Sequence, residues 1–368
     1  MSDKKPIYVT QPTLAPLEDV TALLQGVWES GVMTHNGPLV RRFEKEFAEF
    51  SGLKQAVAVS NGTIAIQMAI RALELKGEII TTPFTFVATV NAILWEDCTP
   101  VFADIDPDTL NIDPVKIEEK ITAKTVAIMP VHVFGNACDV ETIQAIADRH
   151  GLKVIYDAAH AVGVNYKGKS LFRYGDISAT SFHATKMLNT AEGGACITNN
   201  DEWDARLRAI RFFGYDETKD IVCNGFNGKM TEVHAAIGLA NLRYLQRALD
   251  DRKRKYALYR ERLGIVSGLS FQRINEGCNY SYFPVIFPSE TIALQVEKEL
   301  TAAGYIPRRY FWPSVNTYQA LSAYQPCPIS EDIANRILCL PLYYRLLASS
   351  IENIACLVFQ CMRNEGLS

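Results

Sequence analysis

Apolar residues follow two alternating patterns along the first part of the chain. Apolar runs of about five residues, typical of buried strands, occur at residues 56–60, 78–82, 100–104, 125–131 and 153–157. Apolar residues at helical spacing predict helices over residues 17–30, 38–51, 63–75, 86–96, 114–121 and 139–150. Because parallel strands need crossover connections, this alternation predicts an α/β fold with a largely parallel sheet and right-handed crossovers.

The pattern changes after residue 160. Short strands separated by glycine-containing turns are predicted up to residue 200, followed by a helix at 201–213. A long helix is predicted from about residue 230 into the charged run 250–255, which we interpret as a solvated helix face. Further strands are predicted at 279–287 and 305–309, and further helices at 290–303 and 329–336. We expect two domains, residues 1–244 with the N-terminal helices and a smaller C-terminal α/β domain of residues 245–368.

Lys186 is the first candidate for chemistry. It ends the segment Ser-Phe-His-Ala-Thr-Lys (181–186), between an apolar run and the small-residue stretch that begins Glu192-Gly193-Gly194. Most lysines are solvated surface charges, but here the neighbours are apolar and the glycines suggest close backbone approach. Burial lowers the pKa of a lysine, and such an amine forms Schiff bases with carbonyl compounds and with pyridoxal phosphate (PLP). An aldolase would use the same kind of lysine, so other groups must decide.

Asp157 is the second candidate. It ends the predicted strand 153–157 and is followed by Ala158-Ala159-His160-Ala161. Ligands bind beyond the carboxyl ends of strands in open α/β sheets. An aspartate there can keep the pyridine nitrogen of PLP protonated, which makes the ring an electron sink. The simpler interpretation is an acid that caps a turn.

A phosphate site is the third requirement. Asn61-Gly62-Thr63 follows the strand 56–60 and opens the next helix. Free backbone N–H groups and the helix dipole favour an anion at such a point. The same three residues also make an ordinary N-cap, so this signal depends on the other two.

Six segments together resemble the DegT/StrS family of PLP-dependent sugar-nucleotide aminotransferases, over nearly the whole chain. They are residues 61–63, 82–86, 157–160, 181–186, 192–194 and 225–230. The resemblance implies PLP fold type I and a transamination in which glutamate leaves as 2-oxoglutarate and a nucleotide-linked keto sugar is aminated. Residues 77–83 and 130–136 are most similar to enzymes that convert dTDP-4-keto-6-deoxyglucose to dTDP-4-amino-4,6-dideoxyglucose.

The resemblance also implies roles for individual residues. Lys186 would form the Schiff base and transfer protons, Asp157 would pair with the pyridine nitrogen, and His160 would lie near the phenolic oxygen. Phe86 would stack on the ring, although it could also be ordinary core. The phosphate would be held by Gly62, Thr63 and Ser181, and by Asn227 with Lys229 from the second subunit of a homodimer with shared sites. Candidate substrate contacts are Thr34, Asn36, His183, Arg308 and Tyr310, with His183 equally open to a core role.

Composition limits the remaining possibilities. The chain has 368 residues, 48% hydrophobic and 21% charged, enough for a large core and two domains. A net charge of −4 disfavours nucleic acid as a partner. No apolar run could span a bilayer and the first residues lack a secretory signal, so a cytoplasmic protein is expected. Nine cysteines without a CxxC pair indicate reduced thiols, and no metal site is expected.

Three alternative functions stay open. A 3-keto sugar aminotransferase of the same family would carry the same motifs. A sugar 3-dehydratase of the family would have histidine in place of the Schiff-base lysine, which Lys186 disfavours. A non-catalytic regulatory protein on this scaffold is disfavoured by the intact lysine, aspartate and phosphate segments. Among pathways, deoxysugar and O-antigen biosynthesis are expected.

Overall fold

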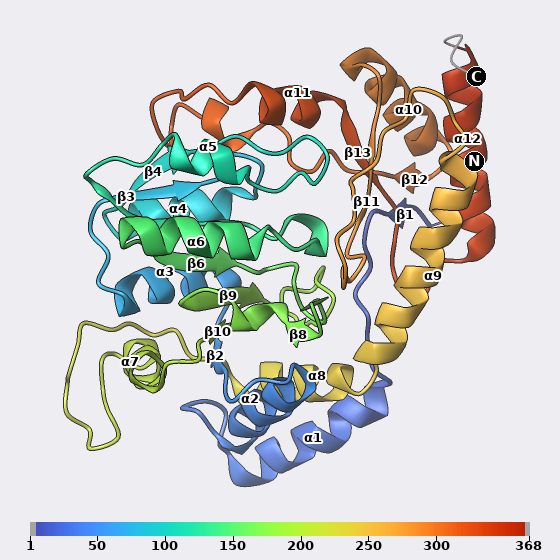
Figure 1. Ribbon diagram of the computed structural model, residues 1–368. Coiled ribbons are helices and arrows are strands. Elements are labelled where there is room, and N and C mark those ends of the chain that lie inside the picture. Colours follow the sequence, from blue (N-terminus) through green and yellow to red (C-terminus); the bar gives the residue numbers. More distant parts are fainter. Residues whose placement is uncertain (1–4, 365–368) are drawn as a thin grey trace.

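A seven-stranded sheet forms the centre of the protein, for which a computed structural model describes residues 5–364 (Figure 1). The strand order is β2-β10-β9-β6-β5-β3-β4. All neighbours are parallel except β10, which runs antiparallel to β2 and β9. The strands are β2 (Val57–Val59), β3 (Glu78–Thr81), β4 (Thr99–Phe102), β5 (Thr125–Met129), β6 (Lys153–Asp157), β9 (Ile177–Ser181) and β10 (Gly194–Ile197). The predicted α/β fold with a largely parallel sheet is confirmed.

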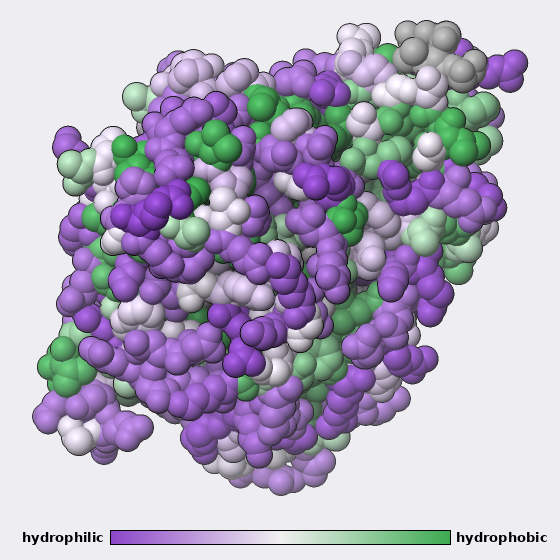
Figure 2. Space-filling model, in the orientation of Figure 1, coloured by the Kyte–Doolittle hydropathy of each residue, from purple (hydrophilic) through white to green (hydrophobic). Residues whose placement is uncertain are grey.

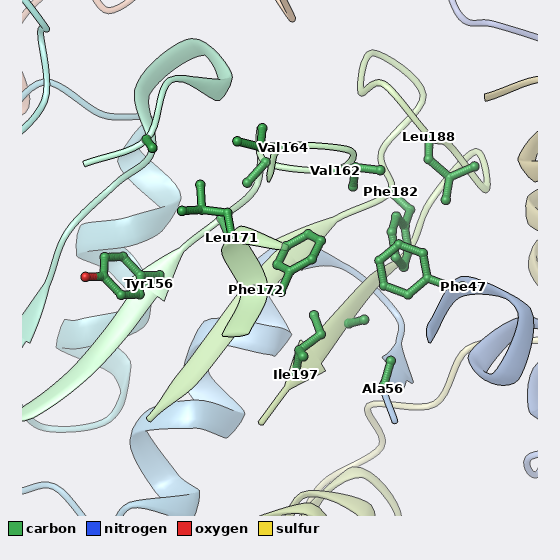
Figure 3. Close-up of a cluster of buried hydrophobic side chains, with 14 of the residues drawn as sticks. Phe47, Ala56, Tyr156, Val162, Val164, Leu171, Phe172, Phe182, Leu188 and Ile197 are labelled. Carbon is green, nitrogen blue, oxygen red and sulfur yellow. The ribbon is translucent and has the colours of Figure 1, made fainter. Parts of the chain in front are cut away.

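Helices cover both faces of this sheet (Figure 1). They are α1 (Leu17–Ser30), α2 (Pro38–Phe50), α3 (Gly62–Ala72), α4 (Val87–Trp95), α5 (Pro114–Glu118), α6 (Val140–His150), α7 (Asp201–Arg211) and α8 (Glu232–Leu242). The period of two along β6 shows how the faces divide. Val154 and Tyr156 enter a core shared with α2 and α6, whereas Ile155 enters a core shared with α3, α4 and α7. Figure 3 shows the first core, where Phe47, Phe172 and Phe182 converge.

The C-terminal part builds a second core around small sheets. Its elements are α9 (Leu245–Leu263), β11 (Phe283–Ile286), α10 (Glu290–Ala302), β12 (Tyr305–Ile306), α11 (Pro328–Arg336), β13 (Ile337–Leu340) and α12 (Ala348–Asn364). β11 pairs with β13, and β12 pairs with β1 (Ile7–Tyr8) from the start of the chain. The hairpin β7 (Asn165–Tyr166) and β8 (Lys169–Ser170) and three short 3₁₀ turns, η1 (Val133–Gly135), η2 (Leu171–Arg173) and η3 (Val315–Thr317), complete the described structure. We propose that residues 1–244 and 245–368 behave as two domains, with β1 held by the second.

In the α8–α9 region one sequence prediction was wrong and a second holds only in part. The single helix expected from residue 230 is broken at Arg243 and Tyr244, both of which contact Asp19 of α1, and the chain turns away from the sheet there. The charged run is not wholly solvated either. Arg252 is 1% exposed, and its Nη1 donates to the carbonyl of Ser281 at 2.7 Å. Periodicity could not show either feature, since the apolar spacing continues across the break.

Candidate active site

The carboxyl ends of β6 and β9 open onto a cavity of about 340 Å³. Asp157 ends β6 and Ser181 ends β9, and the N-terminus of α3 lies beside them. The cavity is lined by most of the predicted site residues: Gly62, Thr63, Phe86, Asp157, His160, Ser181, His183, Lys186, Arg308 and Tyr310. Segments separated by more than two hundred residues therefore meet where an open α/β sheet binds its ligand.

Asp157 is buried at the base of the cavity, with a relative exposure of 5%. Its Oδ2 accepts a hydrogen bond from Thr89 Oγ1 at 2.7 Å, and its Oδ1 accepts one from the Ala159 N–H at 3.1 Å. Burial raises the pKa of this carboxyl, while the two hydrogen bonds and the charge of Lys186 lower it. The donors are those that favour a carboxylate over a carboxylic acid.

Lys186 faces the same cavity. Burial lowers the pKa of its amine to about 8, and the negative charge of Asp157 partly opposes this. A substantial fraction of the amine is therefore neutral and nucleophilic near pH 7 to 8. The chain reaches Lys186 through a tight turn, in which its N–H donates to the His183 carbonyl at 2.8 Å.

The start of α3 forms a cradle for an anion. Asn61 Oδ1 accepts the Ile64 N–H at 2.9 Å, and helix geometry leaves the first N–H groups without acceptors inside the helix. Gly62 packs so tightly that a Cβ there would lie 2.9 Å from Ser181 Cβ. Amine, carboxylate and anion cradle thus occur together around one cavity, and they fit the three binding groups of PLP: aldehyde, pyridine nitrogen and phosphate.

Aromatic rings form two walls. Phe86 immediately precedes α4 and is 57% exposed, whereas Phe84 is fully buried, so Phe86 is not ordinary core. His160 is buried and stacks in parallel with Phe311. Its Nδ1 accepts the Phe134 N–H at 3.3 Å, and burial lowers its pKa well below the ordinary value. The neutral ring then carries its proton on Nε2.

Four predicted residues do not line this cavity within one chain: Thr34, Asn36, Asn227 and Lys229. Asn36 and Lys229 border a second cavity of about 270 Å³ beside Phe212. Asn227 Oδ1 accepts from Lys229 Nζ at 2.6 Å, and that ammonium lies over the rings of Phe212 and Phe213.

Sequence reasoning missed several cavity residues. Thr89 carried no signal, because one threonine in an apolar helix resembles any other. Glu192 was part of a recognised segment but received no role, and Tyr282 and Phe311 lay in strands and loops predicted only coarsely. Between residues 5 and 364, no group of histidine, cysteine and carboxylate side chains could hold a metal, and no helix is long and apolar enough to cross a membrane.

The chain is similar to several known proteins. Residues 17–359 match the DegT/DnrJ/EryC1/StrS aminotransferase family. A dTDP-4-amino-4,6-dideoxy-D-glucose transaminase from Shigella dysenteriae is 42% identical over 361 residues, covering 95% of this chain and 98% of the relative. DesI, solved in the presence of its TDP-sugar product, has a TM-score of 0.92 at 35% identity and covers 97% and 93% of the two chains. NtdA from Bacillus subtilis, solved with bound cofactor PMP, has a TM-score of 0.87 at 29% identity over 94% and 82%.

Proposed function

Because the chain belongs to the DegT/DnrJ/EryC1/StrS aminotransferase family, we propose that it uses PLP to aminate C4 of dTDP-4-keto-6-deoxyglucose, giving dTDP-4-amino-4,6-dideoxyglucose. Glutamate is the proposed amino donor. The observation that carries the proposal is the placement of Lys186, Asp157 and the α3 N-terminus around one cavity. The proposed substrate is inferred from the transaminase of Shigella dysenteriae, because this chain matches 98% of the length of that relative.

Each binding group of the cofactor has a proposed partner in the cavity. Lys186 would anchor it covalently, Asp157 would pair with the pyridine nitrogen, and His160 Nε2–H would face the phenolic oxygen. Phe86 would cover the ring. The phosphate would be held by Gly62, Thr63 and Ser181. Bound PLP supplies an electron sink for the charge that forms when a carbon next to nitrogen loses its proton.

Lys186 is the proposed proton carrier. With a pKa of about 8, its Nζ can take the α-proton of glutamate in the first half-reaction. In the second half-reaction it would return a proton to C4 of the sugar. Asp157 supports both halves, since its buried negative charge stabilises the positive pyridine nitrogen.

The C-terminal part is proposed to hold the substrate. Arg308 and Tyr310 reach the cavity beyond β12, and the Arg308 guanidinium lies 4.9 Å from the Tyr310 ring centre. Within the described chain, no ion pair neutralises Arg308. The Arg308 guanidinium at the cavity can therefore bind the diphosphate of a nucleotide sugar. In the other half-reaction it can bind a carboxylate of glutamate.

A homodimer with shared sites completes the proposal. The segment between α7 and α8 projects from the body, and Figure 2 shows apolar side chains among the polar ones on this projection. Its exposed apolar residues are Phe213, Tyr215, Ile221 and Val222. We propose that this segment binds a second copy and carries Asn227 and Lys229 to the partner's cofactor phosphate, with Thr34 and Asn36 near the same junction. We propose that the enzyme works in the cytoplasm, in deoxysugar and O-antigen biosynthesis.

A substrate panel tests this function. The purified protein with PLP would be incubated with glutamate and a set of nucleotide-linked 3-keto and 4-keto sugars, and mass spectrometry would follow conversion of the C=O group to CH–NH₂. We expect conversion of the dTDP-linked 4-keto-6-deoxy sugar in preference to the others. Preference for a 3-keto sugar would favour the family alternative, and no conversion of any sugar would refute the proposed function.

A further inference from the structure

One pair of cavity residues has no role in the cofactor binding proposed above. Glu192 and His183 both line the cavity on the side of Lys186, and their nearest oxygen and nitrogen, Glu192 Oε1 and His183 Nε2, are 3.8 Å apart. This distance is too long for a direct hydrogen bond. It does leave room for one oxygen atom that bonds to both.

The two side chains are held on a rigid frame. Phe182 N–H donates to the Gly193 carbonyl at 2.8 Å, and Thr190 N–H donates to the Phe182 carbonyl at 2.9 Å. These bonds tie the turn that carries His183 to the loop that carries Glu192. Phe182 itself is fully buried against Phe47, as Figure 3 shows, so the frame is anchored in the core.

Hydrogen bonding fixes what each partner offers. His183 Nδ1 accepts the Thr185 N–H at 3.2 Å, so the neutral ring carries its proton on Nε2, the nitrogen nearest Glu192. The Glu192 carboxylate can only accept. A hydroxyl is both donor and acceptor, and it would satisfy the two residues at once.

The Glu192 side chain has no evident structural task. It is 58% exposed, and within residues 5–364 His183 is the only basic side chain within ion-pair distance. The carbonyl of Glu192 does hold the loop, since it accepts from Thr190 Oγ1 at 2.6 Å. Burial lowers the pKa of His234, and the negative charge of Glu192 opposes part of this shift. A mainly neutral His234 leaves the negative charge of Glu192 available to a ligand.

We propose that Glu192 is a specificity-determining residue which, together with His183, binds the sugar hydroxyl on C3, next to the C4 ketone. The inference rests on the proposed function. His183 and Lys186 are joined by one tight turn and line the same cavity, so the hydroxyl that we assign to the pair is the one nearest the carbon that receives the amine. Glutamate has no such hydroxyl, which confines the effect of the pair to the sugar half-reaction.

The test separates the two half-reactions with Glu192→Ala and Glu192→Gln. The spectral change that glutamate produces in the PLP-loaded protein should keep its wild-type rate in both variants. For the keto sugar, kcat/KM should fall by about tenfold to a hundredfold in Glu192→Ala, the range for loss of a hydrogen bond to a charged group. Glu192→Gln retains a neutral acceptor and should lose less. Glu276→Gln, on an exposed glutamate outside the cavity, is the matched control.

A substrate that lacks the hydroxyl makes the test specific. With the 3-deoxy form of the same nucleotide keto sugar, Glu192→Ala and wild type should have equal kcat/KM. Calorimetric Kd values should likewise differ between the two proteins for the aminated product that has the C3 hydroxyl and agree for its 3-deoxy form. An equal loss on both sugars, or a slower glutamate half-reaction, would overturn the inference and leave the aminotransferase intact. A wild type that aminates no nucleotide sugar would instead refute the proposed function and, with it, this inference.

Discussion

Removing the hydroxyl of Thr89 should weaken catalysis, although Thr89 does not contact the reacting atoms and acts only through Asp157. Thr89 Oγ1 donates to Asp157 Oδ2 at 2.7 Å, and Thr85 Oγ1 lies 2.8 Å from Thr89 Oγ1. Because the Thr89 hydroxyl donates its proton to Asp157, the Thr85 hydroxyl is the donor in the second hydrogen bond. The two hydroxyls therefore form a hydrogen-bond chain that ends on the carboxylate. Both threonines are buried, so water does not replace the lost bond easily.

The magnitude follows from the kind of bond. A hydrogen bond to a charged group contributes about 1.5–3 kcal/mol, which corresponds to roughly ten- to more than a hundredfold in rate if the carboxylate acts only when charged. Thr89→Val keeps the volume and removes the donor, so burial should raise the pKa of Asp157 further. As the pH falls, Asp157 would then take up its proton earlier, and the acid limb of the kcat profile should move to higher pH.

The assay is the pH profile of kcat, together with PLP affinity and melting temperature. Thr81→Val is the matched control, because Thr81 is equally buried and its hydroxyl donates at 2.8 Å to the carbonyl of Met129, away from Asp157. We expect the control to lose stability without a shift of the acid limb. A Thr89→Val profile that coincides with the wild type would refute the idea that this bond maintains the charge of Asp157.

Three further predictions concern the proposed site. Borohydride should fix PLP to Lys186, as peptide mass mapping would show, and Lys186→Ala should lose turnover; labelling of another lysine would contradict the assignment. Asp157→Asn should lower transamination by orders of magnitude while circular dichroism stays unchanged, and near-normal activity would exclude the pairing with the pyridine nitrogen. Mixing inactive Lys186→Ala with an inactive Asn227 variant should restore some activity through hybrid dimers, whereas a fully active monomer by light scattering would exclude shared sites.

Much of the sheet could be predicted because each strand has a local signal. The apolar run that ends at Asp157 and the strand before Asn61 are read directly from neighbouring residues, and both lie at the predicted edge. The amine, the acid and the phosphate site that PLP needs also have local signatures, so Lys186, Asp157 and Gly62 could be predicted from the sequence alone.

The rest depends on contacts between distant segments. Thr89 matters only because α4 places it beside Asp157, and Arg252 is buried only because α9 packs against the segment that carries Ser281. The break between α8 and α9 lies where the chain contacts Asp19 of α1. None of these residues differs in type or spacing from the surface residues that sequence patterns predict, so no local rule could identify them.

The structure of the reaction product decides whether the enzyme aminates C4 of the sugar. The protein would be incubated with PLP, glutamate and dTDP-4-keto-6-deoxyglucose, and the purified sugar nucleotide analysed by NMR. We expect an equatorial amine on C4, with one 2-oxoglutarate formed for each sugar aminated. An amine on C3, an axial amine on C4, or a sugar returned unchanged would contradict it.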